Sequence, residues 1–200
     1  MRTGALEHIA ANLEENPVDI VSCSWGWKTL TIEQDLKDAM VQAFEDLVDT
    51  GISVMASAGN ENDNLQVAFP GRSIFMHNGI MTIGGGYDLE AAGLYSDRYE
   101  GERCYIDDEE GSSYGQGLEL MAIGMNVTTA DIDGTGYRDS SGTSPATAMA
   151  AGIAACLLEQ YRKTPESQRP QEITPAFVES QLVENAEIRY AHDPPSEQGH

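Results

Sequence analysis

Two short stretches of the sequence carry residue types that could perform acyl-transfer chemistry. Ser144 lies in SGTSPATAMAAG, where a Gly-Thr-Ser turn leads into a run of small residues typical of a helix start. Asn60 lies in ASAGNE, directly after an apolar run. A serine hydroxyl becomes a nucleophile when a base removes its proton and hydrogen-bond donors hold the oxyanion that forms on the attacked carbonyl. A helix N-terminus offers such donors to Ser144, and the Asn60 amide can offer another.

Both residues also have a purely structural interpretation. Serine is among the preferred N-cap residues of helices, whether or not it reacts. Asparagine is equally common in the turn that follows a strand. The residue types alone therefore leave both interpretations open.

The elements that must position these residues alternate between helix and strand. Apolar residues recur at helical spacing in four segments, about 6–13, 31–48, 144–161 and 174–183. Short apolar runs predict buried strands at 18–23, 52–58, 80–84 and 118–122. The polar, Gly- and Ser-rich region 88–117 is expected to form surface turns or hairpins. This order predicts an α/β fold with a mostly parallel sheet covered on both faces.

The two motifs together resemble those of the subtilisin-like serine proteases. SGTS at 141–144 resembles the nucleophile motif of that family, and ASAGNE at 56–61 resembles its oxyanion segment. VDIVSCSWG at 18–26 and FPG at 69–71 resemble the strand before that segment and the turn after it. The resemblance runs from about residue 4 to 188. It implies a three-layer subtilisin-like fold without its N-terminal strands, with a partial catalytic domain over 1–190 and a flexible tail over 191–200.

The resemblance also implies roles for individual residues. Ser144 would be the nucleophile of an endopeptidase, and Asn60 would stabilise the oxyanion together with the Ser144 backbone N–H. Glu61 would lie near the base of the first specificity pocket, which would favour basic or polar side chains of a peptide or protein substrate. The substrate-binding residues that the resemblance implies are Ser24, Trp25, Gly26, Trp27, Ala58, Gly59, Glu61 and Thr143.

The proton acceptor of such an enzyme is missing from the sequence pattern. The family's triad runs Asp, His, Ser along the chain, but only His8 and His77 precede Ser144, and neither has the expected glycine beside it. Neither is therefore assigned as the base. Three explanations remain open: the chain is the C-terminal part of a longer protease, the upstream part is another polypeptide, or the protein is a non-catalytic module that binds peptides or partner proteins.

The missing N-terminal strands have a physical consequence. In the family the first strand lies beside the strand expected at 18–23, so this strand becomes an open edge here. Unpaired edge strands invite pairing with other chains. The chain is therefore expected to be marginally stable alone and to associate with itself or with a complementing N-terminal segment.

Composition limits the partners further. The 200 residues include 33 acidic and 11 basic residues, and the net charge of −22 argues against nucleic acid or an anionic membrane as partner. No signal peptide or membrane span is evident, and the compartment stays open because the family is often secreted. Of three cysteines, Cys23 and Cys156 are expected in the core. No cofactor is identified; some family members bind calcium, but the resemblance places no calcium ion here, and the DIDG stretch at 131–134 predicts a surface turn.

Overall fold

The computed structural model describes residues 2–25, 27–28, 33–64, 68–69, 79–88, 102–105, 109–115, 117–169 and 172–186. Its elements, in chain order, are α1 (Arg2–Ala11), β1 (Ile20–Cys23), β2 (Trp27–Lys28), α2 (Gln34–Asp49), β3 (Ser53–Ser57), β4 (Ala68–Phe69), β5 (Ile80–Gly86), β6 (Leu120–Ile123), β7 (Val127–Ala130), β8 (Tyr137–Ser140), α5 (Thr143–Lys163), η3 (Glu166–Gln168) and α6 (Pro175–Glu184). The four helices and four strands expected from periodicity are present, with ends that differ by a few residues, but only β3 and β5 are buried throughout, whereas β1 and β6 are partly exposed. The tail 191–200 lies outside the described residues.

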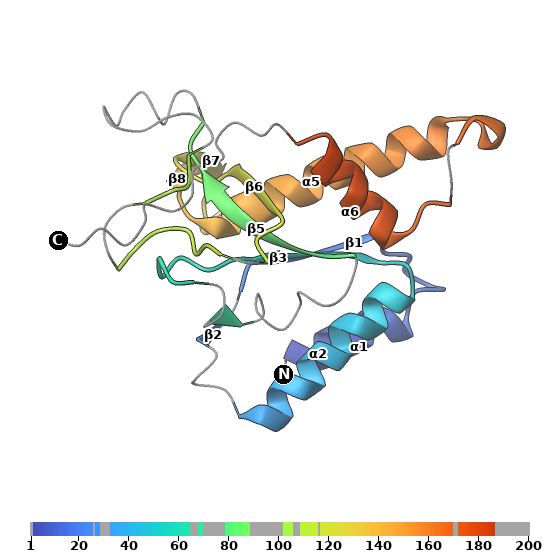
Figure 1. Cartoon of the computed structure of the whole chain (residues 1–200), viewed down its shortest axis with the longest axis horizontal. Helices are drawn as coiled ribbons and strands as arrows, with labels where there is room; N and C mark the ends of the chain where they lie inside the picture. The colour runs from blue at the N-terminus through green and yellow to red at the C-terminus, as the bar shows by residue number, and fades with distance from the viewer. Residues whose placement is uncertain are drawn as a thin grey trace.

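A parallel sheet of four strands forms the middle layer. Its order is β1-β3-β5-β6, and every neighbouring pair is parallel. The helices α1 and α2 lie on one face, whereas α5 and α6 lie on the other (Figure 1). The two central strands are buried along their whole length, as strands covered on both faces should be. The predicted α/β class is confirmed, and β1 is an edge strand as expected.

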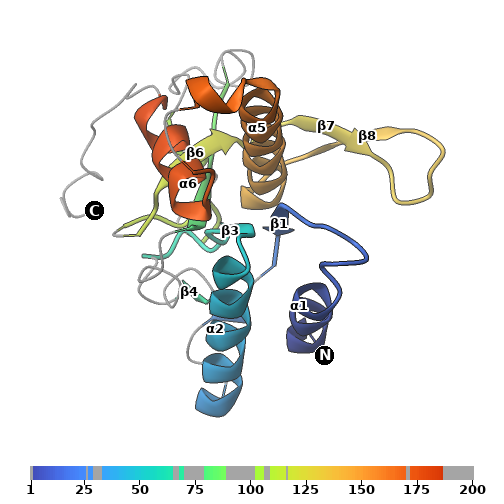
Figure 2. The same ribbon diagram turned by 90° about the vertical axis from the view of Figure 1, so that its right-hand side faces the viewer.

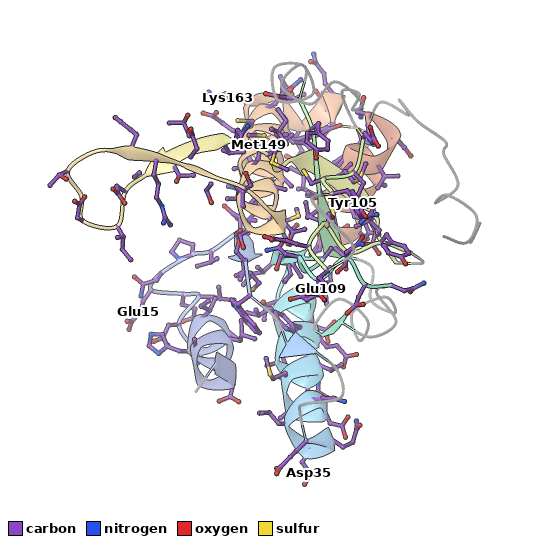
Figure 3. The ribbon with its side chains drawn as sticks, turned by 90° about the vertical axis from the view of Figure 1, so that its left-hand side faces the viewer. Glu15, Asp35, Tyr105, Glu109, Met149 and Lys163 are labelled. Atoms are coloured by element: carbon purple, nitrogen blue, oxygen red, sulfur yellow. The ribbon has the colours of Figure 1, made fainter. Side chains whose placement is uncertain are left out.

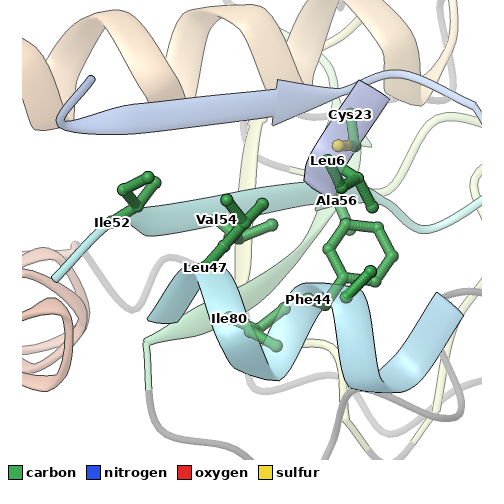
Figure 4. Close-up of a cluster of buried hydrophobic side chains, with 9 residues drawn as sticks. Leu6, Cys23, Phe44, Leu47, Ile52, Val54, Ala56 and Ile80 are labelled. Atoms are coloured by element: carbon green, nitrogen blue, oxygen red, sulfur yellow. The ribbon is translucent and has the colours of Figure 1, made fainter. Parts of the chain in front are cut away.

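Two apolar clusters hold the three layers together. The first lies between the sheet and the helices α1 and α2 (Figure 4). Its buried members are Leu6, Cys23, Ala43, Phe44, Leu47, Ile52, Val54, Ala56 and Ile80. Burial of a side chain such as Phe44, which is 1% exposed, contributes roughly 1.5–3 kcal/mol.

The second cluster lies between the sheet and α5. Ala146, Ala150 and Ala154 recur every fourth residue and are all 0% exposed. This spacing places their small side chains on one helix face, so the α5 backbone can lie close to the sheet. They pack with Met55, Met81 and Ile83 of the strands and with Val178 and Leu182 of α6. Close packing here fixes the position of the amino end of α5.

The helix α6 is anchored at both its start and its side. Thr174 caps it, because its hydroxyl accepts from the Phe177 N–H at 3.1 Å, and Pro175 occupies the first helical position. This is the helix start that the sequence predicts. The Glu179 carboxylate of α6 accepts a hydrogen bond from the Gly79 N–H, just before β5. Glu119 lies nearby, just before β6, and accepts from the Thr82 N–H at 2.6 Å.

The strands β7 and β8 pair as an antiparallel ribbon that extends away from the sheet (Figure 2). Residues 131–136 form its tip, where Asp131 and Asp133 each accept a hydrogen bond from a backbone N–H within the turn. Figure 3 shows the ribbon with its side chains; residues 132–139 are exposed, with Ile132 at 93%, whereas Val127 and Thr129 of β7 are partly buried. The predicted surface turn at 131–134 is confirmed.

Two further expectations about burial are wrong. Cys156 is exposed, because it lies on the face of α5 opposite to the alanines that meet the sheet. The region 88–117 is more than surface turns: in its described part, Cys104, Ser112 and Ser113 are buried. Their burial follows from backbone pairing, since the Cys104 N–H donates to Gly85 and the Ser113 N–H donates to Gly59.

Candidate active site

Ser144 lies in the first turn of α5. The N-cap of this helix is Gly142, and Thr143 and Ser144 are its first two residues, so the alternative in which Ser144 is the N-cap is wrong. Gly142 has φ of 123° and ψ of −171°, a conformation that is essentially restricted to glycine. A Cβ at this position would lie 2.9 Å from both the Nδ2 and the Oδ1 of Asn60. Glycine therefore allows Asn60 to approach the start of the helix.

At the amino end of α5, one backbone N–H has no hydrogen-bond acceptor among the described residues. A helix has four N–H groups at its amino end without intrahelical acceptors. The Gly142 N–H donates to the Gly124 carbonyl at 2.6 Å, and the Thr143 N–H donates to Asn60 Oδ1 at 2.8 Å. Pro145 has no N–H. The Ser144 N–H is the fourth, and no acceptor for it is present among the described residues.

Asn60 is held against the helix start by Thr143. Its Oδ1 accepts from the Thr143 N–H and also from the Thr143 hydroxyl, at 2.9 Å. The same hydroxyl oxygen accepts from the Gly59 N–H at 3.2 Å. Thr143 is 1% exposed, whereas Asn60 is exposed. Because Oδ1 is engaged, the Nδ2 group is the donor that Asn60 can offer to a bound molecule.

The segment after β1 also contacts the start of α5. The Ser24 hydroxyl donates to the backbone carbonyl of Ser144 at 3.0 Å. The Trp25 ring stacks on Phe44 of α2, with ring centroids 5.9 Å apart, and therefore packs in the core. Gly26 and the Trp27 side chain lie outside the described residues, as does the expected turn at Pro70.

The remaining predicted site residues lie beside Asn60. Ala58 is buried and its N–H donates to the Ile83 carbonyl at 2.9 Å, which continues the pairing of β3 with β5. Gly59 has a positive φ of 99°. The Glu61 carboxylate lies over Gly59, since a Cβ there would be 2.6 Å from its Oε2. The structure thus brings Ser24, Gly59, Asn60, Glu61, Thr143 and Ser144 into one region.

A segment that sequence patterns did not single out supports this region. The Gly111 N–H donates to the Asn60 carbonyl at 3.0 Å, and the Ser113 N–H donates to the Gly59 carbonyl at 2.9 Å. Arg103 links the segment to the Asn60 loop, because its guanidinium donates to the Ser112 carbonyl and, at 2.7 Å, to Asn62 Oδ1. The short polar residues of segment 111–113 are typical of surface loops, so no pattern in the sequence could have predicted that this segment supports the Asn60 loop.

A cavity of about 40 Å³ lies between that segment and the start of α5. It has room for one or a few water molecules but not for a large side chain. Its lining residues are Asn60, Cys104, Glu110, Gly111, Ser112, Met125, Ser141 and Gly142. Burial raises the pKa of the Cys104 thiol to about 12, so this thiol stays protonated at neutral pH.

Comparison with known proteins assigns the family. A model of the subtilase family matches residues 3–200. The chain belongs to the subtilase family. It is 30% identical over 161 residues to the serine protease AprX of Bacillus subtilis (strain 168), covering 73% of this chain and 35% of that protein. It is 28% identical over 148 residues to the alkaline serine exoprotease A of Vibrio alginolyticus, covering 74% of this chain and 22% of that protein.

Solved protease structures share the fold. A cold-adapted subtilisin-like serine proteinase superposes with a TM-score of 0.63 at 24% identity, covering 92% of this chain and 53% of that one. The prenylagaramide maturation protease PagA superposes with a TM-score of 0.64 at 21% identity, covering 92% of this chain and 58% of that one. This subtilase chain therefore spans little more than half of the solved chains and about a third or less of the curated relatives.

The described part of this subtilase brings no histidine to Ser144. His8 lies in α1, on the opposite face of the sheet from α5 (Figure 1), and its Nδ1 accepts a hydrogen bond from the Asn12 side-chain amide at 3.2 Å. His77 lies outside the described residues. Within the described residues there is also no cluster of three His, Cys, Asp or Glu side chains that could hold a metal ion. No described helix is long and apolar enough to cross a membrane.

Proposed function

We propose that this chain carries the nucleophile and the oxyanion donors of a serine endopeptidase. The observation that supports this most directly is the pair of free donors at the start of α5. The Ser144 N–H has no acceptor among the described residues, and the Asn60 Nδ2 group lies beside Gly142 while Oδ1 is engaged. Two donors next to a serine hydroxyl are what an oxyanion intermediate requires.

The proposed reaction follows from these positions. The Ser144 Oγ forms a bond to the peptide carbonyl carbon and gives its proton to a base. The carbonyl oxygen becomes an oxyanion, held by the Ser144 N–H and Asn60 Nδ2. Collapse of this intermediate breaks the C–N bond, the base returns the proton to the leaving amine, and water then hydrolyses the acyl-enzyme. The positive end of the α5 dipole favours the negative charge at this position.

The base is proposed to come from outside these 200 residues. Subtilase relatives are longer than this chain, and the described residues present no histidine near Ser144. A histidine and its orienting aspartate are therefore expected on a polypeptide that docks beside the helix start. The alternative is a non-catalytic module that binds peptides through the same surface, and the lack of a base within the described residues is the observation that favours it.

Substrate preference is proposed to depend on Glu61. Its carboxylate lies over Gly59, next to the Asn60 donor, and could attract a basic side chain of the substrate. Glu61→Gln is expected to remove that preference among peptide substrates that differ at one side chain. An unchanged ranking of substrates would exclude Glu61 as the determinant.

A fluorophosphonate probe tests the proposed chemistry. The Ser144 oxygen would bond to phosphorus and displace fluoride, which intact mass detects. The chain is treated with and without the polypeptide encoded directly upstream of Met1, and Ser144→Ala is compared with Ser141→Ala, which removes a hydroxyl three residues away. Labelling only with the upstream polypeptide, lost in Ser144→Ala and kept in Ser141→Ala, supports the protease. No labelling in either case would favour the binding module.

A further inference from the structure

The loop 59–64, which carries Asn60, is connected to the sheet through two intervening segments of extended chain. The segment 102–105 pairs antiparallel with the end of β5. The segment 111–114 pairs with 102–105 on one side. On its other side it pairs with the loop, through four backbone hydrogen bonds of 2.9–3.0 Å. The position of the loop therefore depends on how firmly these two segments hold it.

The Arg103 side chain joins the first of these segments to the loop. Its Nη1 donates to Asn62 Oδ1 at 2.7 Å and to the Ser112 carbonyl. The guanidinium carbon lies 4.8 Å from the ring centroid of Tyr114 and 5.8 Å from that of Tyr105, so both rings help to fix its orientation. Hydrogen bonds from a charged donor are stronger than those between neutral groups. Arg103 is therefore a strong side-chain link between the loop and its support.

The charges of the joined segments give Arg103 a second effect. The described residues 59–64 and 109–115 carry four carboxylates and no basic side chain; the acidic residues are Glu61, Asp63, Glu109 and Glu110. Like charges in two segments that pair repel each other. The positive charge of Arg103, which bonds to both segments, offsets this repulsion. Loss of Arg103 would therefore loosen the loop in two ways.

We infer that Arg103 is a positioning residue for the Asn60 donor. Thr143 orients the Asn60 side chain through Oδ1, but this contact requires that the loop backbone stays in place. Arg103 holds that backbone two residues further along, at Asn62, whose φ of 50° is left-handed. A loosened loop would carry Asn60 Nδ2 away from the Ser144 N–H. The inference rests on the proposed function, which assigns these two donors to the oxyanion.

Hydrogen exchange of the Thr143 amide, followed by NMR in the complete chain, measures this positioning without catalysis. The Thr143 N–H donates to Asn60 Oδ1 at 2.8 Å, so it exchanges with solvent when Asn60 moves away. The Val54 N–H donates to the Gly79 carbonyl at 3.0 Å within the core, and its exchange reports opening of the whole fold. A change at Thr143 alone therefore separates positioning from a general loss of stability.

Two substitutions break the link from opposite ends. Arg103→Met removes the guanidinium and keeps an unbranched apolar side chain. Arg138→Met is its matched control, since Arg138 is exposed on β8 and its loss removes the same charge. Asn62→Gly removes the acceptor and leaves the positive φ accessible. The Arg103→Met/Asn62→Gly double variant shows whether the two side chains act through each other.

Thr143 exchange should become at least about tenfold faster in Arg103→Met and in Asn62→Gly. The Val54 rate in these variants, and both rates in Arg138→Met, should stay within about twofold. Asn62→Gly should accelerate Thr143 exchange at least about fivefold less in the Arg103→Met background, because the bond is already lost there. This comparison cancels the added flexibility of glycine. Circular dichroism checks folding, and if Arg103→Met does not fold, Asn62→Gly decides alone.

Three results would overturn the inference. They are an unchanged Thr143 rate, an equal rise at Thr143 and Val54, or the same effect of Asn62→Gly in both backgrounds. Exchange does not depend on the reactivity of Ser144, so the inference and the proposed function can fail separately. Absence of fluorophosphonate labelling would count against the protease and leave the hold of Arg103 on Asn60 to the exchange data. Labelling without the exchange effect would support the protease and exclude Arg103 as a positioning residue.

Discussion

Replacement of Glu119 by glutamine should change the pH dependence of stability. The Glu119 carboxylate accepts from the Thr82 N–H at 2.6 Å, and Glu179 of α6 faces it. Burial raises the pKa of Glu119 from 4.5 to about 7, the hydrogen bond from Thr82 opposes this rise, and the charge of Glu179 adds to it. The folded chain therefore holds this proton at pH values where the unfolded chain has lost it.

The sign and size of the effect follow from these two pKa values. Since the folded pKa is the higher one, the stabilising contribution is complete below pH 4.5 and is lost as pH rises through about 7. The difference between 7 and 4.5 sets a ceiling of about 3 kcal/mol on the contribution of Glu119 to the free energy of unfolding. Glu119 is only partly buried, so screening by water reduces the expected loss to about 1–2 kcal/mol.

Urea unfolding at pH 4.5, 6 and 8 measures this loss. Glutamine stays neutral, so the unfolding free energy of Glu119→Gln minus that of the parent chain should rise by about 1–2 kcal/mol between pH 4.5 and 8. Because the parent value is subtracted at each pH, the general charge repulsion within this acidic protein cancels. Glu172→Gln is the control, since it removes one negative charge at an exposed position. A difference that stays constant within about 0.3 kcal/mol across this range would refute the reasoning.

Three further perturbations test the site and the fold. Gly142→Ala should lower the free energy of unfolding by about 1–3 kcal/mol, which chemical denaturation measures. It should also displace Asn60, because the new Cβ would lie 2.9 Å from the Asn60 side-chain amide, and the fluorophosphonate labelling rate measures this effect. Thr143→Val should destabilise by about 1–2 kcal/mol through loss of the buried hydroxyl, and Thr143→Ser should restore most of that stability in the same denaturation experiment. Native iodoacetamide treatment should modify only Cys156 of the three cysteines, and intact mass showing two or three adducts before unfolding would contradict the assigned burial.

Much of the fold follows from local patterns in the sequence. The strands β3 and β5 are short apolar runs bounded by glycine, and the alanines of α5 recur every fourth residue, so both indicate buried elements. Thr174 and Pro175 specify the start of α6 through capping and a preset φ. These features depend on residues close together in the chain, which is why periodicity and capping rules reach them.

The supporting contacts of the site could not be predicted in the same way. Ser112 and Ser113 are short and polar, so composition places them on the surface, but pairing with Cys104 and Gly59 buries them. Trp25 matched a cleft wall by sequence, and no pattern indicated that its ring stacks on Phe44. In each case the deciding partner is distant in the chain, and residue type does not encode which distant backbone a segment will meet.

The position of β1 at the edge of the sheet bears on the proposed chemistry. The carboxyl ends of parallel strands lie at the same edge of a sheet, and β1 ends at Cys23, directly before Ser24. The Ser24 hydroxyl in turn donates to the Ser144 carbonyl. A parallel strand added to β1 would therefore end beside Ser24, where residues that follow it could reach the Ser144 hydroxyl. The two donors proposed for the oxyanion lie within these 200 residues, so under that proposal only the group that accepts the proton has to come from elsewhere.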